Sequence, residues 1–468
     1  MKEQTYAVGE VYMNNTRIID HVKTSDPVFA LAMNVASQAH HLRRNGKIIA
    51  AEALGRHALS LTPNNIWAMN QLGGVLIGAG KYKEAEELYI KAMSLAQTEK
   101  EKNVLRHNYA LAIQSQGRFD ETLSIFSEMP QSPFVDWEIF NTLVMAGRLD
   151  EAWPYGESRR TLNTEDYRVF LPDWDGKTDG HLLVTCEQGA GDIIQFARFL
   201  PWARTKVSKI TLATPIPFLG LMNEYPGVDE IVPGMDGCRL PKADFWCPLM
   251  SLPMHRVASG EPGLPPDPDA FRERTKQFAI NTGFTVKVPP GMLSVGIVWA
   301  GNKKHERDWQ RSMNLKDMLP ILSVPGIAIS SLQIGRDGEI ESEGVGSMIH
   351  DCTKALSAGV TYAPGMASWV KTAAAIMGMD LIITVDTGVS HLACALRKPT
   401  WVLMPDVPDW RWPFRGSKTP WYPTARLFRQ KNANDWSGVI QKVVSELQKI
   451  APRPLQESSQ ASHQAPLA

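Results

Sequence analysis

The chain has 468 residues, which is too many for a single hydrophobic core and indicates two or three domains. Hydrophobic residues make up 44% of it and charged residues 21%, values typical of a globular protein. The 49 lysines and arginines balance the 49 aspartates and glutamates, so no global field favours nucleic acid or anionic lipid as a partner. Any recognition of phosphate must therefore be local.

The cysteines and the apolar runs indicate the compartment. Five cysteines are scattered without a CxxC pair or a zinc spacing: Cys186, Cys238, Cys247, Cys352 and Cys394. Such a sparse, odd set is typical of a reducing compartment. Residues 1–20 lack the basic and apolar segments of a signal peptide, and no uncharged apolar stretch reaches the roughly 18 residues of a membrane span. We expect a cytoplasmic protein without a membrane span.

Four segments in the first third of the chain resemble one another: NGKIIAAEAL, AGKYKEAEEL, QGRFDETLSI and AGRLDEAWPY. Each carries a glycine near its start, and these are Gly46, Gly80, Gly117 and Gly147. Gly46 and Gly80 are 34 residues apart, and Ala51 and Ala85 repeat this interval. The later glycine intervals are 37 and 30 residues, so the period drifts along the chain.

A helix–turn–helix unit explains this pattern. Gly80 can end a helix with a positive φ, and Ala85 is small where two helices approach closely. The stretch LTPNN at 61–65 ends one helix and starts the next. The pattern resembles the tetratricopeptide repeat, with its period of about 34 residues, more than a generic helical bundle. We predict this array over 27–160, after an N-terminal extension of 1–26, with a groove that suits peptide or protein.

From about residue 181 the pattern changes to short apolar strands that alternate with helices, which implies parallel sheets. The predicted strands are 181–186, 209–214, 229–234, 243–249, 293–301, 327–335, 381–385 and 400–405, and the clearest helices are 191–204 and 435–450. A proline-rich linker, 263–292, separates a first α/β unit, 178–262, from a second, 293–450. The tail, 451–468, reads as disordered. Ligands of open α/β sheets bind beyond the carboxyl ends of the strands.

The first candidate site follows the strand 181–186. Gln188, Gly189 and Gly191 form a short loop in which glycines allow a sharp turn, and Asp192 falls at the start of a helix. Because helix-terminal amides favour negative charge, we expect an ionised carboxylate that could accept a proton from an attacking hydroxyl. The alternative is that Asp192 only caps the helix, which the local sequence alone favours.

The second unit offers polar groups beyond two of its strands. A loop rich in lysine and arginine follows the strand 293–301, and such cations suit a diphosphate or an acidic sugar. Asn302 and Arg311 border the strand end and the next helix, so they are the candidates there, although a solvated surface loop is the alternative. Gln333 ends another strand and could bind a base or a ribose, or could simply be exposed.

The strand 381–385 leads into a fourth candidate. Asp386 ends it, and Thr387 with the amides around Gly388 offers donors at a helix N-terminus, which suits a phosphate. His391 falls in the first helical turn and could lean toward the same anion. The alternative is a capped helix with one satisfied histidine, but three polar groups beyond a buried strand favour the anion site.

The order of several motifs over 181–436 resembles the bacterial heptosyltransferases, and more closely their relatives in which tetratricopeptide repeats precede the transferase. The matching motifs are EQGAGDIIQFARFLP, ADFWCPLMSLP, VGIVWAGN, RSMNL, SLQIG, DLIITVDTGVSHLACALRKPTWVLMP, DWRW, TPWYP and RLFRQ. The resemblance implies an α + α/β chain in which helical repeats precede a two-lobed GT-B domain built from two Rossmann-like lobes. It also implies that the second lobe holds a donor nucleotide sugar, and that transfer inverts the anomeric carbon without a metal or other cofactor.

The resemblance also implies roles for individual residues. Asp192 matches the general base, and the donor-phosphate loop comprises Asp386, Thr387, Gly388 and His391. Asn302 and Arg311 flank the equivalent of a basic strand-end segment, where the match is looser. The motifs DWRW and TPWYP have no role that physics assigns, so their aromatic residues either line an acceptor groove or pack: Trp410, Trp412, Trp421 and Tyr422.

These features together predict a glycosyltransferase that modifies a hydroxyl, with a protein acceptor held by the repeats. Flagellin, modified on serine or threonine, is the first acceptor to test, by analogy of fold. A nucleoside monophosphate donor, as used for nonulosonic acids, would need fewer cations and also fits. The alternatives are a transferase for a polysaccharide or a lipid-linked glycan, and an inactive scaffold that binds protein through its repeats.

Overall fold

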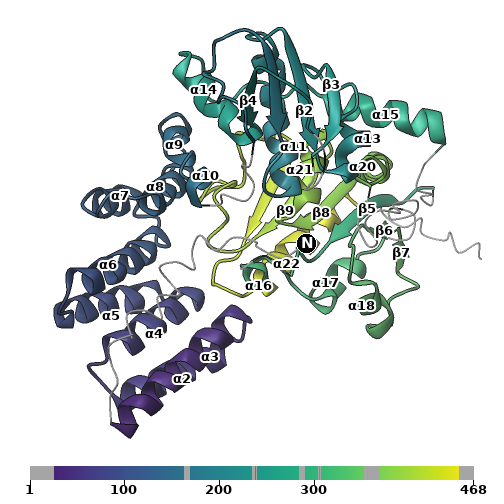
Figure 1. Ribbon diagram of the computed structural model, residues 1–468. Coiled ribbons are helices and arrows are strands. Elements are labelled where there is room, and N and C mark those ends of the chain that lie inside the picture. Colours follow the sequence, from purple (N-terminus) through teal and green to yellow (C-terminus); the bar gives the residue numbers. More distant parts are fainter. Residues whose placement is uncertain are drawn as a thin grey trace, which may run out of the picture.

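The computed structural model describes residues 26–162, 169–234, 240–283, 290–303, 307–352 and 368–452, together with the single positions 238, 305 and 356. The predicted N-terminal extension and C-terminal tail lie outside these ranges, apart from residues 26, 451 and 452. In Figure 1 a helical array extends from an α/β half that contains two sheets. The predicted order, helical repeats followed by a two-lobed α/β domain, is confirmed.

The array consists of helix pairs joined by short turns. The pairs are α2 (Pro27–Arg44) with α3 (Ile48–Leu61), α4 (Ile66–Gly78) with α5 (Tyr82–Leu95), α6 (Glu99–Gln114) with α7 (Phe119–Ser127), and α8 (Pro133–Met145) with α9 (Leu149–Gly156), and the short α10 (Arg159–Leu162) follows. Each turn contains one of the four repeated glycines, whose φ angles lie between 71° and 79°. L-residues rarely adopt this conformation, so the turns explain why glycine recurs there.

Small and capping side chains set the spacing of the array as predicted. Ala51 and Ala85 are fully buried between neighbouring helices. Within the LTPNN break, α3 ends at Leu61 and Asn65 caps α4, because its side-chain oxygen accepts a hydrogen bond from the Ala68 amide at 3.0 Å. The boundary between the first and second repeats is therefore specified by local sequence.

The first lobe is a parallel sheet in the order β3-β2-β1-β4. Its strands are β1 (His181–Thr185), β2 (Lys209–Thr214), β3 (Glu230–Pro233) and β4 (Phe245–Pro248), and its helices include α11 (Ala190–Phe196), α12 (Leu200–Arg204), α13 (Leu219–Met222) and α14 (Leu252–Ala258). The single helix predicted over 191–204 is interrupted by a 3-10 turn, Ala197–Phe199. Pro201 explains the interruption, because it lacks the amide that would continue the α-helical hydrogen bonding.

The second lobe is a six-stranded parallel sheet in the order β10-β9-β8-β5-β6-β7. Its strands are β5 (Leu293–Val298), β6 (Ile327–Ser331), β7 (Ile349–Asp351), β8 (Leu381–Val385), β9 (Thr400–Met404) and β10 (Ala425–Arg429), and its helices include α16 (Asp308–Arg311), α17 (Leu315–Leu322), α18 (Asp337–Ser342), α20 (Trp369–Met377), α21 (Gly388–Ala395) and α22 (Ser437–Ile450). The chain moves outward from β5 to β7 and then crosses to β8. This doubly wound order places its switch point between β5 and β8, and the first lobe has its own between β1 and β4.

Several strand predictions were incomplete, and the strand predicted over 327–335 ends at Ser331. The strand predicted over 293–301 ends at Val298, because the amides of Trp299 and Ala300 bond to the side chain of Gln333 rather than to a neighbouring strand. The edge strands β7 and β10 were missed. The segment predicted as an inter-lobe linker contains α15 (Ala270–Thr282), which packs against α13 and α20. The predicted domain limits otherwise stay predictions.

The array packs its turns against the second lobe. A Cβ atom on Gly46, Gly80 or Gly117 would lie 2.9, 2.7 or 2.6 Å from the side chains of Trp309, Ala433 and Phe414, respectively. These close approaches hold the array against the second lobe, so the repeats pack on the α/β half and are not joined to it by the chain alone. In the described ranges, no helix combines the length and apolar character needed to cross a bilayer.

Candidate active site

The predicted residues of the two lobes lie side by side. The loop after β1 leads into α11 and the loop after β8 leads into α21, and the first turns of these helices are in contact. A Cβ on Gly191 would lie 2.8 Å from the His391 ring, and one on Gly388 would lie 3.1 Å from Ala190 Cβ. Glycine at both positions therefore allows the lobes to approach closely at their switch points.

The loop after β1 turns at a different residue from the one predicted. The left-handed conformation occurs at Gln188, with φ of 62°, whereas Gly189 has an ordinary φ of −93°. A positive φ at a glutamine is uncommon and costs about 1 kcal/mol or more. The role of Gly191 is to leave room for His391, and the sharp turn does not depend on it.

Asp192 caps its helix, as the alternative expected, and it also pairs with a residue of the other lobe, while its role as a proton acceptor stays a prediction. Its Oδ2 accepts a hydrogen bond from the Gly189 amide at 3.0 Å. Its Oδ1 accepts two bonds from the Arg411 guanidinium, at 2.7 Å from Nε and 2.6 Å from Nη2. The residue is 3% exposed, and burial raises its pKa despite the opposing effect of Arg411. The expectation that the helix terminus alone would keep it ionised was therefore too simple.

Arg411 is held from several sides. Its Nη1 donates to Asp409 Oδ1 at 2.7 Å, and its guanidinium carbon lies 4.3 Å from the centroid of the Trp410 ring. Burial would raise the pKa of Asp409, but the Arg411 guanidinium lowers it below the ordinary range. An ionised Asp409 therefore anchors Arg411 beside Asp192.

Asp386 lies at the carboxyl end of β8 and is also buried. Its Oδ1 accepts a hydrogen bond from the Trp412 indole at 2.8 Å, and burial raises its pKa while the charge of Arg311 lowers it. Thr387 precedes α21, and its amide lies 3.4 Å from the Ser390 hydroxyl. The start of α21 thus combines backbone donors with the nearby charges of Arg311 and Arg411.

His391 packs among aromatic side chains. Its Nδ1 lies 3.0 Å from the Tyr422 hydroxyl, and its ring centroid lies 5.0 Å from that of Trp412. Burial lowers its pKa to about 3, so the imidazole is neutral at neutral pH. It can donate a hydrogen bond to an anion but offers no positive charge. Its packing resembles the alternative prediction, a capped helix with one satisfied histidine.

The remaining predicted residues differ in their placement. Arg311 lies against Gly301 at the end of β5, since a Cβ on Gly301 would be 2.9 Å from Arg311 Nε. Asn302 is exposed in the following loop. Gln333 is buried, and its Oε1 accepts bonds from the Trp299 and Ala300 amides at 3.0 and 2.8 Å. This structural role was not predicted, and the assignment of Gln333 to a base or a ribose stays a prediction.

The aromatic residues of the DWRW and TPWYP motifs are buried, so packing is the alternative that describes them. Trp412 bonds Asp386, and Tyr422 bonds His391. Trp410 lies 5.0 Å from the ring of Phe140 in the array, and Trp421 lies under the guanidinium of Arg198 at 5.3 Å. In the sequence, only the two motifs drew attention to these aromatic residues, because the residues that they contact lie far away along the chain.

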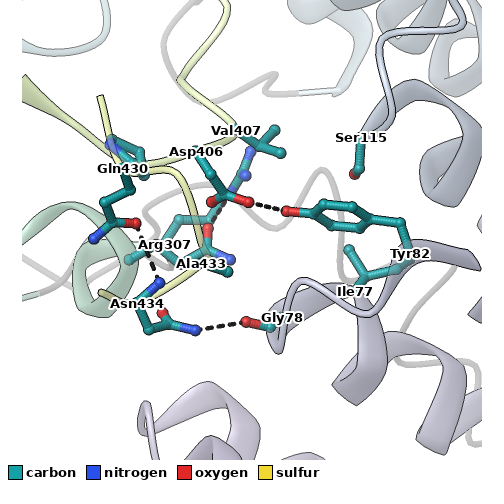
Figure 2. Close-up of a pocket in the computed structure, with 12 residues that line it drawn as sticks. Ile77, Gly78, Tyr82, Ser115, Arg307, Asp406, Val407, Gln430, Ala433 and Asn434 are labelled. Atoms are coloured by element: carbon teal, nitrogen blue, oxygen red, sulfur yellow. Dashed lines mark hydrogen bonds between the residues drawn. The ribbon is translucent and has the colours of Figure 1, made fainter. Parts of the chain in front are cut away.

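A separate pocket of about 300 Å³ lies between the array and the second lobe (Figure 2). Tyr82 donates a hydrogen bond to Asp406, and Asn434 Nδ2 donates to the Gly78 carbonyl at 2.9 Å. Two further hydrogen-bonding residues, Arg307 and Gln430, also line it. Each half of the chain thus contributes polar groups to this junction.

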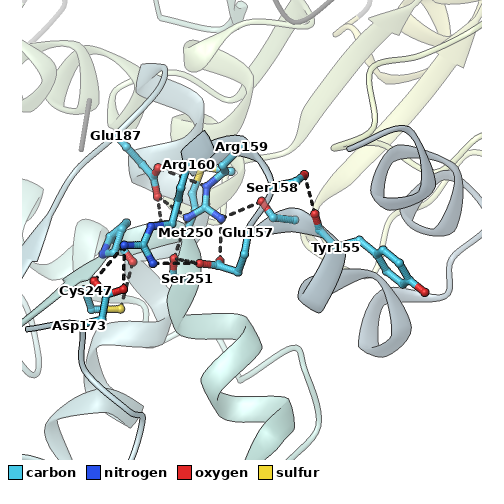
Figure 3. A network of polar contacts seen from close by, with 12 residues as sticks. Tyr155, Glu157, Ser158, Arg159, Arg160, Asp173, Glu187, Cys247, Met250 and Ser251 are labelled. Atoms are coloured by element: carbon cyan, nitrogen blue, oxygen red, sulfur yellow. Dashed lines mark hydrogen bonds and ion pairs between the residues drawn. The ribbon is translucent and has the colours of Figure 1, made fainter. Parts of the chain in front are cut away.

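A buried ionic network joins the end of the array to the first lobe (Figure 3). Arg159 donates to Glu187 at 2.8 Å, to Glu157 at 2.7 Å and to Ser251 at 2.8 Å. Glu187 also accepts a bond from the Met250 amide at 3.0 Å. Since Glu187 immediately precedes Gln188, the network fixes the start of the loop that carries Asp192. Within the described residues, no group of three or more histidine, cysteine, aspartate or glutamate side chains is arranged to hold a metal ion.

Comparisons with known proteins find a match within each half of the chain. Residues 356–439 match the sequence model of glycosyltransferase family 9 (heptosyltransferase), and residues 66–98, which span α4 and α5, match the tetratricopeptide repeat. The protein FlbA of Caulobacter vibrioides is 24% identical over 457 residues, which cover 90% of this chain and 73% of that protein. Both resemblances drawn from the motifs are confirmed.

The solved structures that match this chain have low identity to it and TM-scores below 0.5. A glycosyl transferase family 9 protein from Veillonella parvula is 13% identical and covers 60% of this chain and 99% of its own, with a TM-score of 0.39. The E. coli heptosyltransferase WaaC is 13% identical and covers 57% and 99%, with a TM-score of 0.35. An O-GlcNAc transferase from Thermobaculum terrenum is 12% identical and covers 92% and 88%, with a TM-score of 0.28.

Proposed function

We propose that this chain, a glycosyltransferase with an array of tetratricopeptide repeats, transfers a sugar from a nucleotide-sugar donor to a hydroxyl of a protein acceptor. One observation carries the proposal. The helical turn that carries Asp192 in the first lobe packs against the start of α21 in the second, where Asp386, Thr387 and His391 lie. A proton acceptor and a set of anion-binding donors thus meet where the switch points of two doubly wound sheets face each other.

The proposed reaction is a single displacement. The acceptor hydroxyl gives its proton to Asp192 while its oxygen attacks the anomeric carbon of the donor. The bond from that carbon to the phosphate oxygen breaks, and its electron pair leaves with the nucleoside diphosphate. Attack opposite the leaving group inverts the anomeric carbon. The amides that begin α21 and the charge of Arg311 stabilise the leaving phosphate, so the reaction needs no metal.

Access to Asp192 requires the lobes to separate. The carboxylate is 3% exposed, and the first turns of α11 and α21 cover it. Oδ1 accepts two bonds from Arg411, whereas Oδ2 accepts one bond, from the Gly189 amide. Because Oδ2 keeps a lone pair for a further bond, it is the oxygen that accepts the proton of the acceptor hydroxyl. The proposal therefore includes an opening step before the acceptor binds and a closure before transfer.

The proposed acceptor is a protein in the cytoplasm, and flagellin is the first to test. Support comes from the array, because tetratricopeptide repeats present an extended surface that suits polypeptide. The close contacts of three repeat turns with the second lobe would hold a bound polypeptide at a constant position relative to the site. Transfer to a polysaccharide or a lipid-linked glycan is the alternative that the acceptor panel below tests.

The test is transfer by the purified chain. Nucleoside diphosphate and nucleoside monophosphate sugars are incubated with flagellin or with a lipid-linked glycan, and the intact mass of each acceptor is measured. We expect one donor to add its sugar mass to flagellin at serine or threonine. Glycan modified in place of flagellin would support the alternative, and no mass gain with any donor would reject the proposal.

Asp192→Asn tests the base. We expect transfer to fall by about a hundredfold or more at every pH, because an amide cannot accept the proton. Donor affinity, measured as a shift in melting temperature, should stay close to that of the unaltered chain. The exposed Asp179 provides a matched control, since Asp179→Asn should leave both quantities unchanged. Unaltered turnover in Asp192→Asn would remove the assigned base.

A further inference from the structure

The loop that follows β9, Pro405–Trp412, touches the array and both buried carboxylates. On the side of the array, Asp406 accepts a hydrogen bond from Tyr82, and the Trp410 ring packs against Phe140. On the side of the site, Arg411 binds Asp192 and Trp412 binds Asp386. The loop contains the DWRW motif, which the resemblance left without a role. We call it the DWRW loop.

The contacts of Arg411 determine the orientation of the Asp192 carboxylate. Two guanidinium nitrogens bond the same oxygen, Oδ1, at 2.7 and 2.6 Å. A third bonds Asp409, and the guanidinium lies over the Trp410 ring, so its plane cannot rotate freely. Since the Gly189 amide bonds Oδ2, both carboxylate oxygens have defined directions. Arginine provides this geometry because its donors form a rigid planar fork, whereas lysine has a single rotating ammonium group.

We propose that Arg411 is a positioning residue for sugar transfer, which holds the Asp192 carboxylate ionised and oriented at the contact of the two lobes, while Asp409 holds Arg411. The inference rests on the proposed function, since it gives Asp192 the role of proton acceptor. Arg411 acts through Asp192 and therefore should influence the turnover number more than the affinity for the donor. It also explains why an arginine follows the aspartate and tryptophan of this motif.

Within the described residues, two charged side chains change the pKa of Asp192. Arg411 favours its ionised form, and Asp409 opposes it. From α21, His391 faces the helix that carries Asp192, and burial lowers the pKa of His391 to about 3. Burial raises the pKa of Tyr422, which bonds that histidine, well above its ordinary value. Both of these side chains are therefore neutral near pH 7, and among the described residues Arg411 is the cation that bonds Asp192.

The first test compares pH profiles of turnover. Because removal of a cation beside a buried carboxylate raises its pKa further, we expect the acidic limb of Arg411→Met to move upward by about one pH unit or more. At a pH on the acidic limb, turnover should then fall by about tenfold and recover at higher pH, with the donor KM changed less than about twofold. Arg411→Lys keeps the charge but loses the fork, so its limb should stay in place while turnover falls at all pH values.

The control for charge is Arg426→Met, which removes an arginine that pairs with Glu446 on the surface of the second lobe. Its pH profile should coincide with that of the unaltered chain. The proposal is overturned if Arg411→Met leaves the acidic limb in place. It is also overturned if the donor KM rises strongly without a shift of the limb, since Arg411 would then bind the donor directly.

A second test does not depend on activity, so it separates this inference from the proposed function. In Arg411→Met the buried Asp192 has a raised pKa, and its stabilising protonation is lost as pH rises through that value. As pH rises from about 4, the ordinary pKa of an aspartate, we therefore expect the melting temperature of Arg411→Met to keep falling beyond the pH at which the corresponding fall of the unaltered chain ends. In the double variant Arg411→Met with Asp192→Asn this fall should disappear. A fall that persists in the double variant, or no fall at all, rejects the claim that Arg411 keeps Asp192 ionised, even if no donor supports transfer.

Discussion

Asp192, Asp386 and His391 show that burial and pairing together decide the charge of a side chain. Burial raises the pKa of both aspartates, and a neighbouring arginine opposes this for each of them. For His391, burial and the charge of Arg411 outweigh the opposing effect of Asp409, and its pKa falls to about 3. The proposed site therefore contains two carboxylates with adjacent arginines and a neutral imidazole. An anion bound there would meet its positive charge in arginine and in helix-terminal amides.

Because His391 is neutral, we can predict how its titration affects the affinity for the donor. The affinity for a nucleoside diphosphate sugar, whose phosphates keep a constant charge, should not change between about pH 5 and pH 8, because His391 with a pKa of about 3 stays unprotonated throughout. Isothermal titration across this range measures it. His391→Ala should weaken binding by about tenfold or less while the pH curve stays flat.

The control is His57→Ala, which replaces an exposed histidine of the array and should leave the affinity as it is. A loss of affinity between pH 6 and pH 7 that vanishes in His391→Ala would mean that the imidazole is charged in the complex. An affinity untouched by His391→Ala would remove this residue from the donor-phosphate loop.

The helix pairs of the array share one kind of turn, but the turns do not share their surroundings. Gly117 and Gly147 have nearly equal φ angles, 78° and 79°. A Cβ on Gly117 would lie 2.6 Å from the Phe414 ring, whereas one on Gly147 would meet nothing within 4 Å. The repeated glycine is thus required by the turn at both positions, and by contact with the second lobe at only one of them.

This difference provides a matched pair of substitutions. Gly147→Ala should lower the free energy of unfolding by about 1–2 kcal/mol, the cost of the left-handed conformation for an L-residue. Gly117→Ala should cost about 1–3 kcal/mol more, because the ring of Phe414 must also move. Urea denaturation of both variants measures the difference. Equal losses would show that the array does not pack against the second lobe at this turn.

The whole molecule is held together at two junctions between the array and the α/β half. Turns of the first three helix pairs pack on the second lobe, while Arg159 after the last pair enters a buried network with Glu187 of the first lobe. The array therefore contacts both lobes, and the loop that carries Asp192 begins at one of these contacts. A polypeptide bound to the repeats would be held on the same framework as the proposed site.

Arg159→Met should destabilise the chain by about 3–5 kcal/mol, because Glu187 would remain buried without its partner. The side chains of Arg159 and Glu187 are 3% and 1% exposed. The double variant Arg159→Met with Glu187→Gln should recover part of this loss, since no buried charge then remains. Denaturant unfolding, followed by tryptophan fluorescence, measures both variants.

Arg148→Met is the matched control, because Arg148 pairs with Glu151 and Asp120 on the exposed surface of the array. Solvent screens such pairs, so this variant should unfold like the unaltered chain. If the double variant were less stable than Arg159→Met alone, the network would owe its stability to packing and not to the compensation of charge.

Local patterns in the amino-acid sequence determined much of the fold. The four glycines marked the repeat turns, and all four have a positive φ. The central strands followed from apolar runs, and β2 and β8 have the predicted bounds. The alternation of strands and helices also implied parallel sheets, which bring residues after β1 and β8 to carboxyl edges. These features depend on neighbours in sequence, so the sequence alone could reveal them.

Only the tertiary structure decided which side chains meet there and what charge they carry. Arg411 lies 219 residues from Asp192, and no local pattern relates them. The same holds for the bond from Trp412 to Asp386, the neutral state of His391, and the use of Gln333 to end β5. Burial and pairing arise when distant segments exclude water from the same place. The sequence could therefore indicate where a site forms, but the packing of the lobes determines how its acids and bases are held.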